Sequence, residues 1–275
     1  QINKSIMNYS DLRRYNTIVI PSGRSLSNNN KDVLLSWIKQ GGTLIAHNNS
    51  VRSLTNENGI GNVKQIQYTF DNSKDFNIDL QREIYSLNNE IELEKTLSNK
   101  VYTDILYPWE IVTNNLSKDD LENRDEWQSL FMPSGSIVSG RTDQKHWLTF
   151  GSSEIVPLLY GNYPVLMTGG NSQAAVRIGE LFESVNSNEV IEINWSSIPA
   201  GNDINVRMSG LVWPEAAQRI ANSAYLTRER IGDGQIILFS GEPNFRGSAL
   251  GTNRLWLNAL IYGAGLGTNK KVNLD

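Results

Sequence analysis

The pattern of apolar and polar positions near the amino terminus predicts a strand, a helix and a second strand. Residues 17–20 form a short, β-branched and almost entirely apolar run, which is typical of a strand covered on both faces. Apolar residues then recur at helical spacing from Val33 to Ile38, and Gly41 follows as the residue type that commonly closes a helix. Residues 43–46 begin the second strand. We therefore expect two parallel strands joined by a right-handed helical crossover.

Ligands of such units bind beyond the carboxyl ends of the parallel strands. The polar residues that follow the two strands are therefore ligand-binding candidates: Ser22, Gly23, Arg24, His47, Asn48 and Asn49.

The middle of the chain has mixed periodicity. The apolar spacing from Leu80 to Ile91 predicts a helix, and Ser117 has the pattern of a capping residue that opens a short acidic helix through Trp127. A loop over residues 53–64 and short strands over 66–70 and 135–140 complete this region, and the aromatic run 102–109 has no assigned element. Residues 62–145 as a whole resemble an insertion.

Regular patterns return in the last part of the chain. We expect a buried strand at residues 164–168, a helix over Ser172 to Val185, and strands at 190–195, 206–212, 224–231 and 235–239. The turn Gly232-Asp233-Gly234 predicts a hairpin between the last two strands, and residues 252–262 form a final helix. The whole chain, 1–275, is thus predicted to be a single α/β domain, with a mainly parallel sheet and an antiparallel extension.

Composition excludes several functions. The net charge is −4 and there is no long basic run, so neither nucleic acid nor an anionic membrane is an expected partner, and no apolar run is long enough for a membrane span. The absence of Cys excludes disulfides, thiolate metal sites and a thiol nucleophile within this chain. The chain begins with Gln1 and without a signal-peptide pattern, and we expect it to be a fragment of a longer protein.

Searches for catalytic motifs also give negative results. The two histidines, His47 and His146, lie in neither an HExxH nor an HxxE pattern, which disfavours a zinc site built from this chain alone. The GxSxG elbow of serine hydrolases is missing after the second strand, and no phosphate-binding loop follows any strand. The sequence does not exclude a glycosidase-type pair of catalytic carboxylates, but no particular pair of Asp or Glu residues is distinguished by its position.

Two stretches resemble known families. The unit from Tyr15 to His47 is similar to the class I glutamine amidotransferase-like fold, in which one strand ends in a Pro-x-Gly loop and the next carries the nucleophile elbow. The run from Gly234 to Gly247, with GQIILFSGEPNFRG, and the segment GTNRLWLNAL that starts at Gly251 resemble the end of bacterial M14-family zinc carboxypeptidase-like proteins. The segment HWLTFG that starts at His146 is similar to another part of that region.

The resemblance implies a flavodoxin-like, three-layer α/β domain attached to a secreted or periplasmic peptidase. The expected partner is the peptidase domain of the same polypeptide, and zinc is expected only in that domain, so that this chain itself needs no cofactor. The amidotransferase elbow requires Cys, which this chain lacks. Thiol-dependent glutamine hydrolysis is therefore excluded, and the fold is expected without the reaction.

Individual residues keep two interpretations each. His47 is a ligand candidate or a histidine that only packs beside a strand end, whereas His146 is expected to be structural. Arg246, in a loop with Glu242 and Asn244, has the planar guanidinium needed to bind a carboxylate such as a peptide terminus, but pairing with Glu242 or with backbone carbonyls is the more common role. Core packing is the default for the tryptophans, although Trp109, Trp127 and Trp213 are candidates for a sugar- or peptide-binding surface.

These observations favour a non-catalytic accessory carboxyl-terminal domain of a zinc carboxypeptidase-like protein. Two alternatives stay open. One is a carbohydrate- or peptide-binding module. The other is an independent hydrolase that uses His47 together with Ser22, Ser50 or a carboxylate.

Overall fold

The computed structural model describes residues 2–23, 25–88, 116–184 and 190–268. The aromatic run 102–109, which includes Trp109, lies outside the described residues, as do Ile91 and Arg24.

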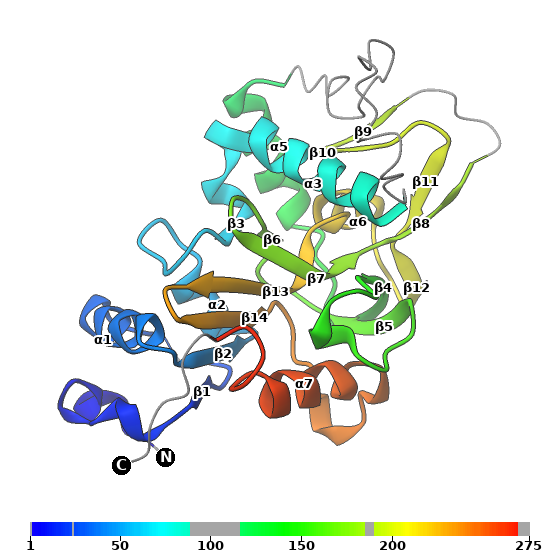
Figure 1. The fold of residues 1–275 in the computed structure, drawn as a ribbon. Coiled ribbons are helices and arrows are strands. Elements are labelled where there is room, and N and C mark those ends of the chain that lie inside the picture. Colours follow the sequence, from blue (N-terminus) through cyan, green and yellow to red (C-terminus); the bar gives the residue numbers. More distant parts are fainter. Residues whose placement is uncertain (1, 24, 89–115, 185–189, 269–275) are drawn as a thin grey trace, which may run out of the picture.

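A mixed sheet forms the centre of the molecule (Figure 1). Its main path runs β1-β2-β14-β13-β7-β4-β12, and β3, β5 and β6 join at the side. Parallel pairing joins β1 to β2 and β2 to β14, while the remaining pairs are antiparallel. The predicted α/β class and the parallel first unit are confirmed, but the antiparallel part of the sheet is larger than the sequence suggested.

The strands of this sheet and its attached pairs have the following bounds: β1 Thr17–Ile20, β2 Thr43–His47, β3 Lys64–Gln65, β4 Ser136–Thr142, β5 Ile155–Tyr160, β6 Leu166–Met167, β7 Ser172–Ile178, β12 Arg207–Ser209, β13 Ala224–Ile231 and β14 Gly234–Phe239. Two smaller antiparallel pairs join β8 (Glu180–Glu183) to β11 (Asn202–Asn205) and β9 (Ile191–Ile193) to β10 (Ser196–Ile198).

The α-helices are α1 Asn28–Lys39, α2 Asn49–Leu54, α3 Ser73–Asn88, α5 Lys118–Ser129, α6 Pro214–Ile220 and α7 Leu250–Tyr262. Short 3₁₀ helices occupy Lys4–Tyr9, Leu12–Arg14, Ile66–Tyr68, Phe70–Asn72, Trp147–Thr149 and Phe245–Gly247. These helices confirm four predictions from the sequence: helices at residues 33–38, from Leu80 onward, at 117–127 and at 252–262. The capping prediction is confirmed too, because Ser117 and Asp120 form a reciprocal capping box at the start of α5.

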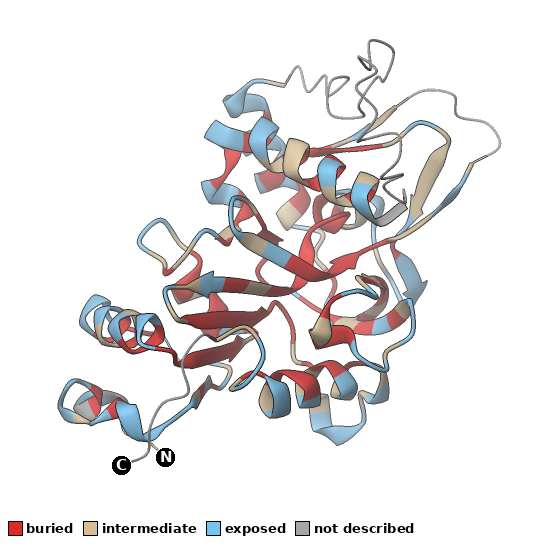
Figure 2. Ribbon diagram, viewed as in Figure 1, coloured by how far each residue is buried: buried red, intermediate tan, exposed pale blue. Residues whose placement is uncertain are grey.

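Both faces of the parallel part are covered by helices (Figure 2). Side chains alternate along a strand, so neighbouring residues of β2 point to opposite faces. Leu44 packs in one core cluster with residues of α1 and α2, such as Leu34 and Val51. Ile45 packs in the other cluster with residues of α7, such as Leu255. The two halves of the core therefore meet at β2 and β14.

One strand differs from the expectation of burial on both faces. Ile18 and Ile20 of β1 are buried, but Val19 is 37% exposed. The reason is that β1 is the edge strand of the sheet, with β2 as its neighbour on one side.

The predicted helix over residues 172–185 is wrong. The chain forms β7 there, turns at Gly179, whose φ is +101°, and continues as β8. The apolar residues fit both periods, but β7 lies between β13 and β4, where two sets of backbone hydrogen bonds fix the extended form. The predicted strand at 66–70 is also wrong, because 3₁₀ turns occupy that segment.

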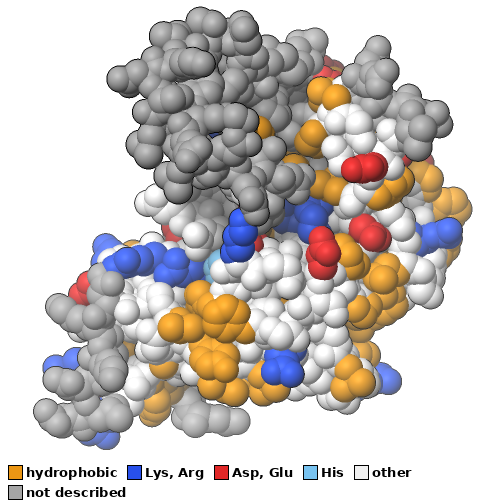
Figure 3. Space-filling view, turned by 45° about the vertical axis from the view of Figure 1, so that its right-hand side comes forward, with side chains coloured by type: hydrophobic (Ala, Val, Ile, Leu, Met, Phe, Trp, Pro, Cys, Tyr) orange, Lys and Arg blue, Asp and Glu red, His pale blue; other side chains and the backbone are white. Residues whose placement is uncertain are grey.

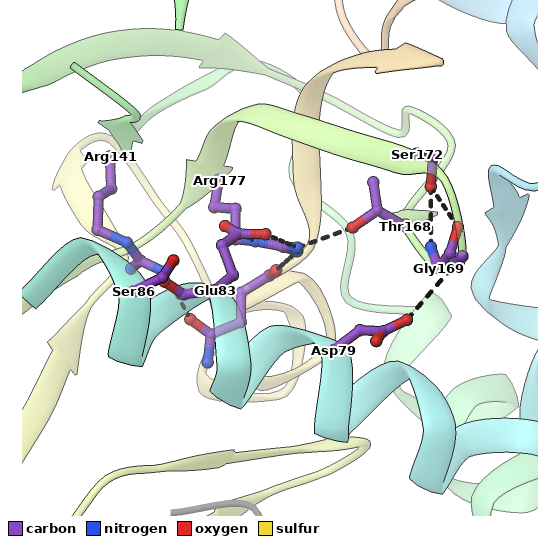
Figure 4. Close-up of polar contacts among 10 residues, drawn as sticks. Asp79, Glu83, Ser86, Arg141, Thr168, Gly169, Ser172 and Arg177 are labelled. Atoms are coloured by element: carbon purple, nitrogen blue, oxygen red, sulfur yellow. Dashed lines mark hydrogen bonds and ion pairs between the residues drawn. The ribbon is translucent and has the colours of Figure 1, made fainter. Parts of the chain in front are cut away.

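A buried ion pair attaches α3 to the sheet (Figure 4). Arg177 of β7 is 3% exposed and donates from Nε and Nη2 to the two carboxylate oxygens of Glu83, each at 2.6 Å. Its remaining donors reach the backbone oxygen of Asn222 at 2.9 Å and Oγ1 of Thr168 at 2.7 Å. Four of the five guanidinium N–H groups of Arg177 thus have acceptors in the protein.

Breaking this pair should destabilise the fold. We expect Glu83→Gln to lower the free energy of unfolding by about 3 kcal/mol, because it leaves the Arg177 charge buried without its counter-charge. The measurement is urea unfolding followed by circular dichroism. The matched control is Lys118→Gln, which breaks the exposed pair with Asp71 and should cost less than about 1 kcal/mol. Equal losses in both variants would contradict the assignment.

Candidate functional site

The parallel pairing brings the predicted site residues to one edge of the sheet. Phe239 of β14 is opposite His47 of β2, and Ile20 of β1 is opposite Ala46. The segments that leave these three strands are therefore neighbours: Ser22 and Gly23, Asn48 and Asn49, and the loop from Ser240 to Arg246.

Asn48 occupies a sharp turn between β2 and α2. Its φ of 54° and ψ of −134° lie in a region that residues other than Gly rarely adopt. Its backbone N–H donates to the oxygen of Phe239 at 3.0 Å, which extends the ladder of the sheet by one residue. The side chain is 7% exposed. A strained residue between a parallel strand and a helix, at the carboxyl edge of the sheet, has the local geometry of a nucleophile elbow.

The side chain of Asn48 is held by Glu242. Its Nδ2 donates to Oε1 of Glu242 at 3.1 Å, which joins the turn after β2 to the loop after β14. In the described part of the chain, Oδ1 of Asn48 is buried without a hydrogen-bond partner. The elbow therefore carries an amide that can still accept one hydrogen bond.

His47 lies directly before this turn. Its ring meets the Trp256 ring of α7 edge-on, with centroids 5.5 Å apart, and its buried Nδ1 has no hydrogen-bond partner among the described residues. Burial lowers the pKa of His47, and the nearby Glu242 carboxylate opposes this shift in part. The imidazole is accordingly neutral near pH 7.

Ser50 has a structural role at the start of α2. It is fully buried, and its hydroxyl donates to the backbone oxygen of His47 at 2.7 Å or of Ile20 at 3.2 Å. These contacts tie the ends of β1 and β2 together and turn the hydroxyl toward the backbone.

The remaining predicted residues lie farther out. Asn49, Asn244 and Arg246 are exposed, and Ser22 is half-buried. Arg246 has a φ of 51°, and its guanidinium lies over the Phe245 ring at 5.1 Å from the centroid. The ion pairs among the described residues do not join Arg246 to Glu242. Of the two common roles predicted for Arg246, the pairing with Glu242 is thus not found among the described ion pairs, and the pairing with backbone carbonyls stays a prediction.

The sequence did not identify Tyr163 and Trp256 as parts of this site. The Tyr163 ring packs over Gly241, where an added Cβ would lie 3.1 Å from it, and both burial and the Glu242 carboxylate raise the pKa of Tyr163. Trp256 was identified only as a core residue of its helix. Neither residue belongs to a motif, so only the tertiary structure reveals that they surround His47 and Glu242.

His146 has the structural role that was predicted. It is 8% exposed, and its Nδ1 accepts from the backbone N–H of Leu148 at 3.1 Å at the start of a 3₁₀ helix. Burial is the main cause that lowers its pKa.

No group of three or more potential metal ligands occurs among the described residues. In the same part of the chain, none of the helices combines the length and the apolar composition needed to cross a bilayer.

Comparisons with known proteins give little further information. No protein-family model matches the chain, and no curated protein matches it. A solved structure described as a cytoplasmic protein from Salmonella typhimurium is similar, with 12% sequence identity and a TM-score of 0.38 over 94% of this chain and 78% of that chain. A similarity at this level carries no argument about function.

The electrostatic relation between His47 and Glu242 can be tested directly. We expect Glu242→Gln to lower the pKa of His47 further, because it removes the negative charge that favours the imidazolium. The pKa is measured by NMR titration of the imidazole protons. Glu57→Gln, a change on an exposed loop residue, serves as the control and should leave the titration unchanged. A higher pKa in Glu242→Gln would contradict the described geometry.

The strain at Asn48 predicts an unusual order of stability. We expect Asn48→Gly to be more stable than Asn48→Ala by about 1–2 kcal/mol, because only Gly adopts this backbone region without cost. At the exposed helical position Ser36 the order should reverse, since Gly is worse than Ala inside a helix by about 1 kcal/mol. Urea unfolding of the four variants gives both differences. The same order at both positions would show that the turn is not strained.

Proposed function

We propose that this chain is a non-catalytic domain with the flavodoxin-like, three-layer architecture of class I glutamine amidotransferase-like proteins. We further propose that it serves as the accessory carboxyl-terminal region of a secreted zinc carboxypeptidase-like protein of bacteria. The observation that carries the first part is Asn48, which stands at the apex of an elbow-like turn and donates to Glu242 at 3.1 Å.

An asparagine at the apex of the elbow supports the proposal that the chain keeps this turn but has lost the amidotransferase reaction. Acyl transfer at an elbow needs a thiolate or an activated hydroxyl as nucleophile. The Asn48 amide offers neither, and its nitrogen is engaged by a carboxylate. Its role is instead to join the loop after β14 to the turn after β2. The amide would stabilise the edge of the sheet at which the related enzymes carry out chemistry.

Of the hydroxyls named for the hydrolase alternative, Ser50 is not paired with His47 among the described residues. Ser50 is the hydroxyl nearest in sequence to His47, and it donates to backbone oxygens rather than to the ring. A serine nucleophile needs a hydrogen bond to its general base. The neutral imidazole of His47 therefore packs beside Trp256 without a hydroxyl partner from this segment.

The accessory role is supported by an exposed apolar surface on α7. Phe150 and Tyr262 contact each other with ring centroids 6.3 Å apart, and they are 49% and 42% exposed. Leu257 and Ile261 are neighbours on the same helix, four residues apart, and are also exposed. Hydrophobic side chains gather in patches on the face shown in Figure 3. Exposed apolar patches commonly mark interfaces, and we assign this one to the peptidase domain of the same polypeptide.

The proposal predicts a division of activity between this chain and the longer polypeptide. We expect the purified chain to turn over neither glutamine, nor ester, nor peptide substrates, and to purify without stoichiometric zinc. A polypeptide that ends in this chain should bind zinc through an HxxE motif and a later His upstream of Gln1, and should release carboxyl-terminal residues from peptides. Substrate turnover and metal analysis by mass spectrometry provide the measurements.

The variant His47→Ala separates the outcomes. In the longer polypeptide it should leave the peptidase activity within about twofold, because the zinc site lies elsewhere. Glutamine or ester turnover by the isolated chain that disappears in His47→Ala would overturn the non-catalytic part. An upstream sequence without HxxE would overturn the accessory part alone.

A further inference from the structure

A groove lined by other residues than the elbow carries features of a ligand site. It has a volume of about 810 Å³ and lies between α5, α6 and the small strands β9 and β11. Its volume is in the range of small-molecule sites, about 300–1,000 Å³. The residues that define it here are Arg124, Trp127, Gln128, Asp203, Arg207 and Glu215.

Trp127 lines this groove and belongs to an aromatic row that continues outside the groove through Phe131 and Trp213. Trp127 and Phe131 meet with ring centroids 5.1 Å apart, and Phe131 and Trp213 with centroids 6.3 Å apart. Trp127 is 57% exposed and Trp213 is 50% exposed. The default expectation of core packing is therefore wrong for these two tryptophans. Large aromatic faces left open beside a groove offer a surface on which a flat, partly apolar ligand can stack.

The floor of the groove is polar and fixed. Asn194 donates from Nδ2 to Oε1 of Gln128 at 2.8 Å, and Nε2 of Gln128 donates to Oε1 of Gln218 at 3.3 Å. Below this chain, Arg219 of α6 binds both carboxylate oxygens of Asp125 of α5, at 2.7 and 3.0 Å, and both side chains are 9% exposed. The two helices that carry the tryptophans are thus locked together, which lowers the entropy lost on binding.

One acceptor in this groove lacks a donor. Oε2 of Glu215, at the start of α6, is buried and has no hydrogen-bond partner among the described residues. A buried carboxylate oxygen without a donor is costly, and a ligand hydroxyl would supply one.

The charges of the groove disfavour an ionic ligand. Two arginines, Arg124 and Arg207, and the acidic residues Asp203, Glu215 and Glu192 all line it, so that neither sign dominates. A strongly charged ligand would meet like charges on the walls. A neutral ligand with many hydroxyl groups avoids this cost, because each planar amide, carboxylate or guanidinium can hydrogen-bond to hydroxyls.

We propose that this groove binds a neutral glycan. The C–H faces of a sugar ring would stack on Trp127, while the hydroxyl groups hydrogen-bond to the polar floor and to Glu215. The site is formed by α5 and α6 and needs neither the elbow nor a peptidase partner. Its existence is therefore independent of the function proposed above.

The test is binding of neutral oligosaccharides to the full chain. Cellohexaose, chitohexaose and maltohexaose are titrated by isothermal calorimetry and by the change in tryptophan fluorescence. At least one should bind with saturation. Trp127→Ala should weaken binding by at least about tenfold, as for other central aromatic anchors, and Glu215→Gln should weaken it less.

Tyr9→Ala is the matched control, because it removes a 90% exposed aromatic side chain that does not line the groove and should leave binding unchanged. Circular dichroism of each variant confirms folding. Saturable binding to none of the three oligosaccharides would overturn the proposal, as would binding that survives Trp127→Ala. Binding of an unstructured peptide at the same tryptophan, with no oligosaccharide bound, would replace the glycan by a peptide ligand and equally overturn it.

Discussion

The pairing of β2 between β1 and β14 is the constraint on which the rest of this structure depends. These three strands are parallel, so their carboxyl ends reach one edge together, although β14 comes almost 190 residues after β2 in the chain. The antiparallel hairpin of β14 with β13 then connects this unit to the remainder of the sheet. Without that pairing, Asn48 and Glu242 would not meet, and the two core clusters would lose the residues that β2 and β14 contribute to both of them.

The same constraint explains why a strained turn is tolerated at Asn48. The backbone N–H of Asn48 bonds to Phe239, its side chain bonds to Glu242, and Ser50 fixes the next residues to the ends of β1 and β2. Each contact stabilises the turn by a modest amount, and together they offset a backbone cost of about 1–3 kcal/mol. A turn that three separate contacts stabilise is retained whether or not it carries a nucleophile.

The sequence predicts the local parts of this arrangement well. Apolar runs identify β1, β2, β13 and β14 almost to the residue, and the Gly232-Asp233-Gly234 turn identifies the hairpin. The predictions fail where tertiary contacts decide. Residues 172–178 alternate in a way that fits a helix as well as a strand, and only their two sheet neighbours select the strand. Val19 is apolar and yet exposed, because its strand ends the sheet.

For the candidate site, sequence reasoning finds the right edge but not the right contacts. The residues that follow strands could be read from the chain, whereas the link between Asn48 and Glu242 joins positions 194 residues apart and leaves no local signal. The groove beside Trp127 is a second example of a feature that the local sequence does not reveal. Its aromatic residues were visible in the sequence, but an aromatic residue is buried by default, and only the tertiary structure shows that Trp127 and Trp213 are 57% and 50% exposed. In both places a pair of charged or polar side chains joins segments that lie far apart in the sequence, and such a contact leaves no local signal.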